Sequence, residues 1–143
     1  MSGIRESRLV IAQRPTRRDR LHGAWWPRTT DVKTELAPML DEVALRFQAV
    51  LGVMLNSDEW PASSPAERPS VAGKVKISWY GVTEPNLVVL RCKDACRIAL
   101  LLLPPNMIET VALTAILMAS TPGNDLSASE TIARAADRAS SLR

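Results

Sequence analysis

The sequence predicts an α+β fold in which a twisted, mostly antiparallel sheet of about five strands carries three helices, packed mainly on one face. Four of the five strand-like segments follow one another without an intervening helical pattern, and short connections between consecutive strands favour antiparallel pairing. Two helical patterns then end the chain, so strands and helices are segregated as in α+β proteins. The predicted order of elements is β-α-β-β-β-β-α-α.

The strands are recognised by alternating or continuous runs of apolar residues. They cover residues 8–13, 50–56, 74–80, 87–92 and 97–103. Residues 74–80 alternate between apolar and polar side chains, as in a half-exposed strand. Residues 97–103 are apolar on both faces, so we expect a central strand that is covered on both sides. The segment Lys93-Asp94-Ala95 predicts a hairpin tip between the last two strands, flanked by Cys92 and Cys96 as reduced, structural cysteines.

The first helix is predicted from Thr30 or Asp31, either of which is a good N-cap, to about Gln48. Apolar residues recur along it at intervals of three and four, which places one apolar stripe against the sheet. Pro38 lies inside this pattern and removes one helical hydrogen bond. It therefore predicts either a kink or a helix that begins near Pro38.

Two further helices follow the last strand. Asn106 with Glu109 three residues later predicts the start of an apolar helix that runs to about Ala119. Ser127 and Glu130 form a capping-box pattern, which predicts a last, alanine-rich helix.

Length and composition indicate one globular domain over residues 1–143, since 46% of the residues are hydrophobic and 23% are charged. Residues 1–20 are expected to form a partly flexible basic arm, and residues 57–73 a long loop rich in proline and serine. The longest apolar runs are too short for a signal peptide or a membrane span. A cytoplasmic protein is therefore expected.

Tryptophan supplies four of the six aromatic residues, and three of the four lie in predicted connections. Large aromatic rings with one polar edge favour pockets and interfaces. The leading hypothesis is thus a non-enzymatic binding module for a peptide, a partner protein or a small amphipathic anion. The residues expected to form its site are Trp25, Trp26, Arg28, Asp58 and Trp60. A structural role for the same rings, bracing the sheet and first helix, remains the alternative.

A second hypothesis is nucleic-acid binding through the N-terminal segment. Residues 1–28 contain seven arginines and only two acidic residues, whereas the rest of the chain is acidic on balance. Such a segment attracts polyanions. The arginines assigned to this arm are Arg14, Arg17, Arg18 and Arg20.

A third hypothesis is a small enzyme that uses His22 with Asp58 or Glu59, although no catalytic motif connects them. No catalytic residue is assigned. Cys92 and Cys96 lack a second pair of zinc ligands, so neither a metal nor another cofactor is expected. The apolar helix after Asn106 leaves a homodimer open.

One run of residues resembles a known family. The resemblance rests on Gly23-Ala24-Trp25-Trp26-Pro27-Arg28, Asp31, Glu35 and Leu36, and later on Asn56, Trp60-Pro61, residues 75–80, residues 101–105, Pro122-Gly123-Asn124 and Leu126-Ser127-Ala128. These positions resemble a family of small actinobacterial proteins of unknown function, over nearly the whole chain after residue 8. The resemblance implies a free-standing intracellular domain, without an established activity, substrate or cofactor.

Overall fold

The computed structural model describes residues 8–13, 16, 18–61, 68–81 and 84–141. Within them, seven strands form one mixed sheet in the order β1-β2-β7-β6-β3-β5-β4. Its strands are β1 (Leu9–Ile11), β2 (Gly23–Trp25), β3 (Val50–Asn56), β4 (Val71–Ala72), β5 (Val75–Tyr80), β6 (Leu87–Cys92) and β7 (Arg97–Leu102). The helices are α1 (Val32–Arg46), α2 (Glu109–Ala119) and α3 (Ala128–Ser141), and a short 3-10 helix, η1, spans Ser57–Glu59.

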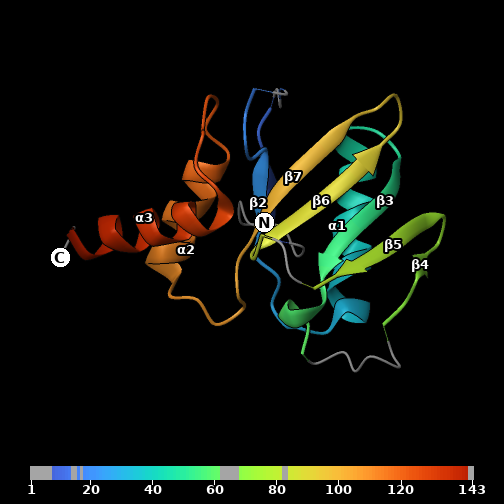
Figure 1. Ribbon diagram of the computed structural model, residues 1–143, viewed down its shortest axis with the longest axis horizontal. Helices are drawn as coiled ribbons and strands as arrows, with labels where there is room; N and C mark the ends of the chain where they lie inside the picture. Colours follow the sequence, from blue (N-terminus) through green and yellow to red (C-terminus); the bar gives the residue numbers. More distant parts are fainter. Residues whose placement is uncertain (1–7, 14–15, 17, 62–67, 82–83, 142–143) are drawn as a thin grey trace.

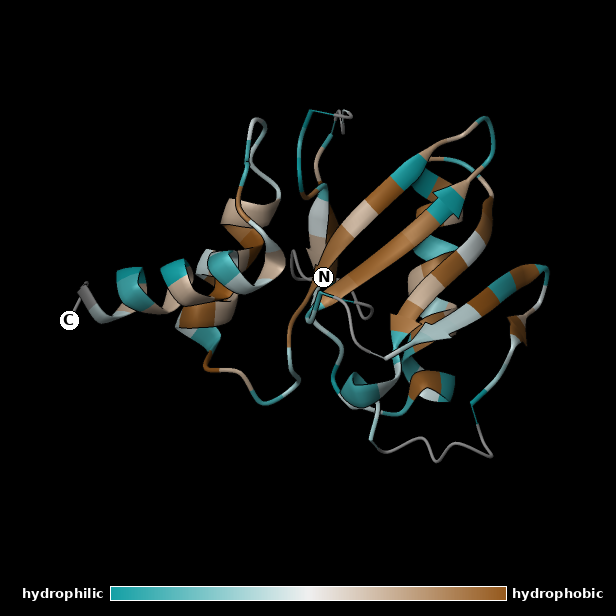
Figure 2. Ribbon diagram, in the orientation of Figure 1, coloured by the Kyte–Doolittle hydropathy of each residue, from teal (hydrophilic) through white to brown (hydrophobic). Residues whose placement is uncertain are grey.

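Two hydrophobic cores lie on opposite faces of the sheet. One face packs against α1 through large side chains such as Leu36, Met39 and Val43. The other face packs, at the β2–β7 side, against α2 and α3, which form a separate layer in Figure 1. Figure 2 shows β6 and β7 as mainly hydrophobic along their length. The central strands are thus the shared wall of both cores.

The α+β class and the three helices are confirmed, but three details of the predicted fold are wrong. The sheet has seven strands instead of about five, the order of elements is β-β-α-β-β-β-β-β-α-α, and the helices lie on both faces. The sheet is mostly antiparallel as predicted, and the β2–β7 and β3–β5 pairings are parallel. The strands β2 and β4 have three and two residues, too few to show an alternating pattern. The two-sided apolar character of β7 is confirmed, and it requires a layer on each face.

Strand β2 approaches β1 closely at Gly23. A Cβ atom added to Gly23 would lie 2.1 Å from the carbonyl oxygen of Val10. Only glycine fits at this position, because the opposing atom belongs to the backbone. Gly23 therefore permits the β1–β2 pairing, in which Leu9 opposes Trp25 and Ile11 opposes Gly23.

Helix α1 begins where the capping pattern predicts. The Asp31 side chain accepts a hydrogen bond from the Lys33 N–H, and the helix then continues through Pro38 to Arg46. Pro38 lies on the exposed side of the helix, where its missing N–H does not weaken the core. The predicted start near Pro38 is wrong, and the helix ends two residues before Gln48.

The two C-terminal helices differ in how they begin. The Ser127–Glu130 capping box is confirmed, since the Ser127 N–H donates to the Glu130 carboxylate and the Glu130 N–H donates to the Ser127 hydroxyl. The predicted cap at Asn106 is wrong, because α2 starts at Glu109 after Ile108 and has no side-chain cap. A turn in which the Met107 N–H donates to the Pro104 carbonyl precedes it.

The β6–β7 hairpin turns at the predicted residues. Asp94 and Ala95 both have φ of 59°, the left-handed conformation that tight hairpin turns require. Cys92 and Cys96 are free thiols on either side. Burial, together with the neighbouring Cys96, raises the pKa of the Cys92 thiol to about 12, which keeps it protonated and unreactive.

A set of hydrogen bonds, which we call the clasp, joins the β1–β2 connection to the α2–α3 connection. The Asn124 side chain accepts from the Leu21 N–H at 2.8 Å and donates to the Leu21 carbonyl at 2.8 Å, so it pairs with Leu21 as a neighbouring strand would. The Asp19 carboxylate accepts from the Gly123 N–H and from Thr16. The clasp fixes the helical layer to the sheet.

The clasp generates a stability prediction. Asn124→Ala leaves both backbone groups of the buried Leu21 without a partner, so we expect the free energy of unfolding to fall by about 2 kcal/mol. Urea denaturation measures this value. Asn106→Ala serves as the matched control, because Asn106 is exposed and a surface change of this kind alters stability by less than about 0.5 kcal/mol. Equal effects of the two substitutions would contradict the role of the clasp.

Candidate functional site

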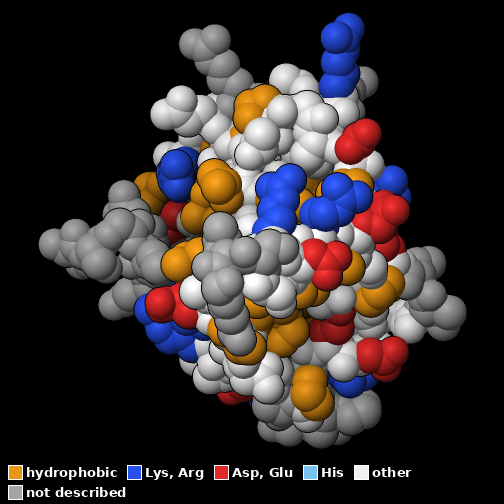
Figure 3. Space-filling view, turned by 90° about the vertical axis from the view of Figure 1, so that its left-hand side faces the viewer, with side chains coloured by type: hydrophobic (Ala, Val, Ile, Leu, Met, Phe, Trp, Pro, Cys, Tyr) orange, Lys and Arg blue, Asp and Glu red, His pale blue; other side chains and the backbone are white. Residues whose placement is uncertain are grey.

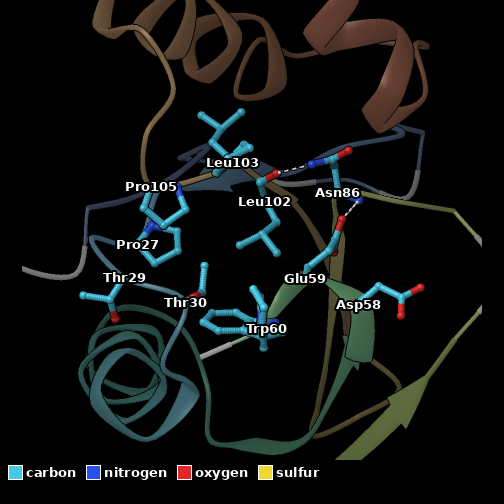
Figure 4. A pocket seen from close by; sticks show the side chains of 12 residues that line it. Pro27, Thr29, Thr30, Asp58, Glu59, Trp60, Asn86, Leu102, Leu103 and Pro105 are labelled. Carbon is cyan, nitrogen blue, oxygen red and sulfur yellow. Dashed lines mark hydrogen bonds between the residues drawn. The ribbon is translucent and has the colours of Figure 1, made fainter. Parts of the chain in front are cut away.

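An apolar pocket of about 150 Å³ lies where several strands end at one edge of the sheet. Strands β3 and β7 are both antiparallel to β6, and β2 is parallel to β7. The carboxyl ends of β2, β3 and β7 therefore meet at this edge, a common place for ligand sites in sheets with parallel strands. The pocket is lined by Pro27, Thr29, Thr30, Asp58, Glu59, Trp60, Pro61, Asn86, Leu102, Leu103, Pro104 and Pro105 (Figure 4).

The connection from β2 to α1 forms one wall. It is held by the Glu35 carboxylate, which accepts from the Arg28 N–H at 3.1 Å and from the Thr29 hydroxyl at 2.9 Å. An acidic side chain in the first turn of a helix is favoured by the helix dipole. Glu35 thus fixes Pro27, Thr29 and Thr30 beside the pocket.

The 3-10 helix η1 forms the opposite wall. The Asn56 side chain accepts from the Asp58 N–H at 3.0 Å and turns the chain at the end of β3. This turn places the Trp60 ring in the pocket wall (Figure 4). Behind it lies Trp25, with 5.3 Å between the ring centroids and 38° between the ring planes. The tryptophan pair makes this wall rigid and apolar.

Glu59 provides an acidic group at the edge of the pocket (Figure 4). Its Oε2 accepts a short hydrogen bond from the Asn86 N–H, and Asn86 in turn donates through its side chain to the Leu102 carbonyl at 3.2 Å. The other oxygen, Oε1, is buried and has no hydrogen-bond partner among the residues that the structure describes. A buried acceptor without a partner is unfavourable by about 1–3 kcal/mol.

The surroundings of Glu59 disfavour its charged form. Burial raises the pKa of Glu59, the Asn86 hydrogen bond lowers it in part, and the neighbouring Asp58 raises it further. Burial, with the charges of Glu59 and Glu84, likewise raises the pKa of Tyr80 to about 12. The Tyr80 hydroxyl stays protonated and donates to the Leu87 carbonyl at 2.6 Å. This hydrogen bond fixes the residue that directly follows Asn86.

The structure brings together some of the residues predicted from the sequence and separates others. Trp60 and Asp58 line the pocket, and Trp25 supports Trp60 from behind. Trp26 lies in the core on the opposite face, where its indole donates to the Pro104 carbonyl. The exposed fractions of Trp25, Trp60 and Trp26 are 0%, 1% and 5%, so all three rings are enclosed by the chain itself.

Arg28 does not line the pocket, and its backbone N–H donates to the Glu35 carboxylate. The Asp31 carboxylate accepts from the Lys33 N–H at the start of α1, and the Glu35 carboxylate accepts from the Arg28 N–H ahead of the helix. Both carboxylates place negative charge beside Arg28, which disfavours an anionic ligand at this part of the predicted site.

The N-terminal arginines are in part engaged within the fold. Arg8 donates to the Trp26 and Pro27 carbonyls and lies 3.9 Å above the Trp26 ring. Arg20 pairs with Glu84 at 3.3 Å, whereas Arg18 is exposed. Two other arginines assigned to the arm, Arg14 and Arg17, lie outside the described residues, as do residues 1–7.

His22 is placed away from the pocket carboxylates. It precedes the first residue of β2, whereas the pocket lies beyond the last one. Its Nδ1 accepts from the Ala99 N–H at 3.0 Å, and its Nε2 lies 2.7 Å from the Thr16 carbonyl. Both nitrogens are thus used by the backbone in the neutral Nε2–H tautomer, and the geometry does not join His22 to Asp58 or Glu59.

In the described part of the chain, no group of three His, Cys, Asp or Glu side chains is arranged to hold a metal ion. None of its helices is both long and apolar enough to cross a bilayer.

The sequence did not lead to Asn86, Leu102 or the prolines after β7 as site residues, and Glu59 was considered only in a catalytic role, with Asp58 or with His22. The proline pair at the end of an apolar strand was the signal that could have indicated this part of the site. Two prolines end the strand, and their rigid rings can form an apolar surface there. The predicted loop 57–73 contributes η1 and β4, while its central residues 62–67 lie outside the described residues.

The raised pKa of Glu59 generates a prediction about pH. A carboxyl that binds its proton more tightly in the folded protein makes stability fall as pH rises through that range. Glu59→Gln removes this charge, so we expect the variant to gain stability relative to the parent protein between about pH 4 and pH 7. Urea denaturation at several pH values measures the difference. A constant difference across this range would contradict it.

Asp19→Asn gives the opposite sign and serves as the contrast. The Gly123 N–H, with further hydrogen bonds from Thr16, lowers the pKa of Asp19. Its contribution to stability is therefore present above about pH 4 and is lost as pH falls further. Asp19→Asn should be less stable than the parent at neutral pH, with a difference that shrinks in acid.

Comparison with known proteins gives one match. A model described as "Family of unknown function (DUF5994)" matches residues 8–119, which include every strand, α1, α2 and all residues of the pocket. No match was found among curated proteins or among solved structures. Because the match covers most of the chain, this protein belongs to the DUF5994 family, whose function is unknown.

Proposed function

We propose that this protein is a binding module whose pocket takes a small apolar ligand with one hydrogen-bond donor, such as an amine. The apolar part of the ligand would pack against Trp60, Leu102 and the proline rings. The donor would pair with the Glu59 carboxyl. This proposal keeps the binding role expected from the sequence and replaces the anionic ligand with a neutral or cationic one.

The unpartnered Oε1 of Glu59 is the observation that carries the proposal. It lies at the edge of an otherwise mostly apolar pocket, and a few convergent polar groups in an apolar cavity are typical of ligand sites. The terminal torsion of a glutamate side chain has a broad energy minimum, so a small rotation presents Oε1 to a ligand. A donor on the ligand would then remove the unfavourable free energy of the unpaired acceptor.

The charges around the pocket support the choice of ligand. Asp58 and Glu59 are the ionisable residues that line it, and Asp31 and Glu35 lie in the adjoining first turn of α1. A carboxylate ligand would meet repulsion from all four. An ammonium group would be attracted, and it would also favour the charged form of Glu59.

Benzylamine, toluene and benzoate test the proposal, because a cavity of about 150 Å³ accommodates a benzene ring. We expect benzylamine to bind more tightly than toluene and benzoate to bind most weakly. Glu59→Gln should weaken benzylamine binding about tenfold, as for loss of a hydrogen bond to a charged group. Tryptophan fluorescence, with Trp60 as the reporter, and ligand-observed NMR measure the affinities.

Asp58→Asn is the matched control. Asp58 also lines the pocket, but its side chain is exposed and points away from the cavity in Figure 4. It should therefore change benzylamine affinity far less than Glu59→Gln. Equal losses in the two variants, or equal affinity for benzylamine and benzoate, would overturn the proposal.

A homodimer stays a prediction. Ile108, Leu113 and Leu117 of the α2 region are exposed, Leu117 by 67%. Figure 3 views the side of the molecule that carries α2 and α3, where hydrophobic side chains are interspersed with charged ones.

A further inference from the structure

The α2–α3 layer leaves half of its sheet face uncovered. Helix α2 packs against β2 and β7, and α3 packs against α2; in Figure 1 both helices lie to one side of β6, β3 and β5. On the uncovered half, Met54 is 45% exposed, and Lys76, Ser78 and Arg91 are exposed as well. This half of the sheet face is named the open face below.

Basic residues form a row across the open face. In the strand register, Arg97 of β7 opposes Arg91 of β6, Arg91 opposes Gly52 of β3, and Gly52 opposes Lys76 of β5. The row is thus perpendicular to the strands and spans four of them. The hydrophilic ends of β6 and β7 lie side by side in Figure 2.

The pairing of Arg91 with Arg97 is unfavourable for folding. Like charges directly opposite each other on neighbouring strands are destabilising. Within the described residues, the side chains of Lys76, Arg91 and Arg97 form neither an ion pair nor a hydrogen bond. Their charges are therefore compensated by no described acidic residue.

Gly52 makes a hollow at the centre of the row. The hollow has a volume of about 250 Å³ and is lined by Gly52, Val53, Met54, Lys76, Ser78, Val89 and Arg91. A Cβ atom added to Gly52 would lie 3.3 Å from Nη2 and 3.6 Å from Nε of Arg91. The missing side chain thus allows the Arg91 guanidinium to lie down over the sheet.

We propose that the open face binds the phosphate group of a nucleotide between Arg91, Arg97 and Lys76. A guanidinium binds phosphate through two parallel N–H donors, and an ammonium group adds a compact charge. Lys76 and Arg91 stand two strands apart, roughly 10 Å between their backbones, which leaves room for a phosphate between the side chains. The anion would also relieve the repulsion between Arg91 and Arg97.

The same phosphate chemistry is found in free nucleotides and in nucleic-acid strands. Sheet surfaces that read single strands stack bases on exposed aromatic rings. The aromatic residue nearest in register on this face, Tyr80, uses its hydroxyl to hold the Leu87 carbonyl. The residues that line the hollow include no aromatic ring on which successive bases of a strand could stack. A single phosphate-bearing ligand, for which a free nucleotide is the probe, is therefore favoured over a strand.

NMR titration of the ¹⁵N-labelled protein tests the proposal with ATP, AMP and a ten-residue oligothymidylate as probes. We expect ATP to cause saturable shifts of the Gly52, Lys76 and Arg91 amides. Arg91→Gln should weaken ATP binding at least about tenfold. Tighter binding of the oligonucleotide than of ATP would show that the open face binds the phosphates of a nucleic-acid strand and would overturn the proposal of a free nucleotide. Shifts confined to other surfaces, or no saturation with any probe, would overturn the proposal.

Two controls separate a site from general electrostatics. Arg46→Gln removes the same charge from α1, on the opposite face of the sheet, and should leave ATP affinity unchanged. Gly52→Ala keeps every charge but displaces the Arg91 guanidinium, so it should weaken ATP binding while the fold is retained. Equal effects of Arg46→Gln and Arg91→Gln would overturn the proposal.

Stability gives an independent readout. Arg97→Gln should raise the thermal midpoint of unfolding in the absence of ATP, because it removes a like-charge pair, while it weakens ATP binding. A lower midpoint would show that the arginine pair stabilises the fold and would contradict a role in anion binding. Glu59→Gln should not alter ATP binding, so failure of this site is distinguishable from failure of the apolar pocket.

Discussion

Strand β2 has only three residues, but its parallel pairing with β7 determines the arrangement of a large part of the molecule. Consecutive side chains of an extended chain face opposite ways, so Trp25 enters the core beside α1 and Trp26 enters the core beside α2 and α3. The pairing also brings the chain after Trp26 next to the chain after Leu102, where both contribute to the apolar pocket. Both layers and the pocket depend on this short ladder.

The two proposed sites have opposite electrostatic character and lie on different parts of the sheet. At the pocket, the Glu59 carboxyl is held where burial disfavours its charge. On the open face, Arg91 and Arg97 are paired although they repel each other. Each site therefore contains an arrangement that is unfavourable for folding and that no described residue offsets. Such arrangements are concentrated at functional sites.

Local signals in the sequence predicted local structure well. The Asp31 cap and the Ser127–Glu130 box depend on neighbouring residues alone, and both occur as expected. The parallel pairing of β2 with β7 joins segments about 75 residues apart, and no local pattern reports it. Aromatic residues pointed to Trp60 but not to Glu59, because the character of that carboxyl comes from its burial and from Asn86, which is distant in sequence.

The helices on the two faces of the sheet bury side chains of different size. Helix α1 buries valine, leucine and methionine side chains, whereas the buried residues of α2 are the alanines Ala112, Ala115 and Ala119. A buried alanine removes little apolar area from water, so α2 itself contributes less apolar burial to its core than α1 contributes to the other core. We therefore expect α2 and α3 to behave as a separate cooperative unit. Their amides would exchange with solvent through partial unfolding, while the amides of β3 and β6 exchange only when the whole domain unfolds.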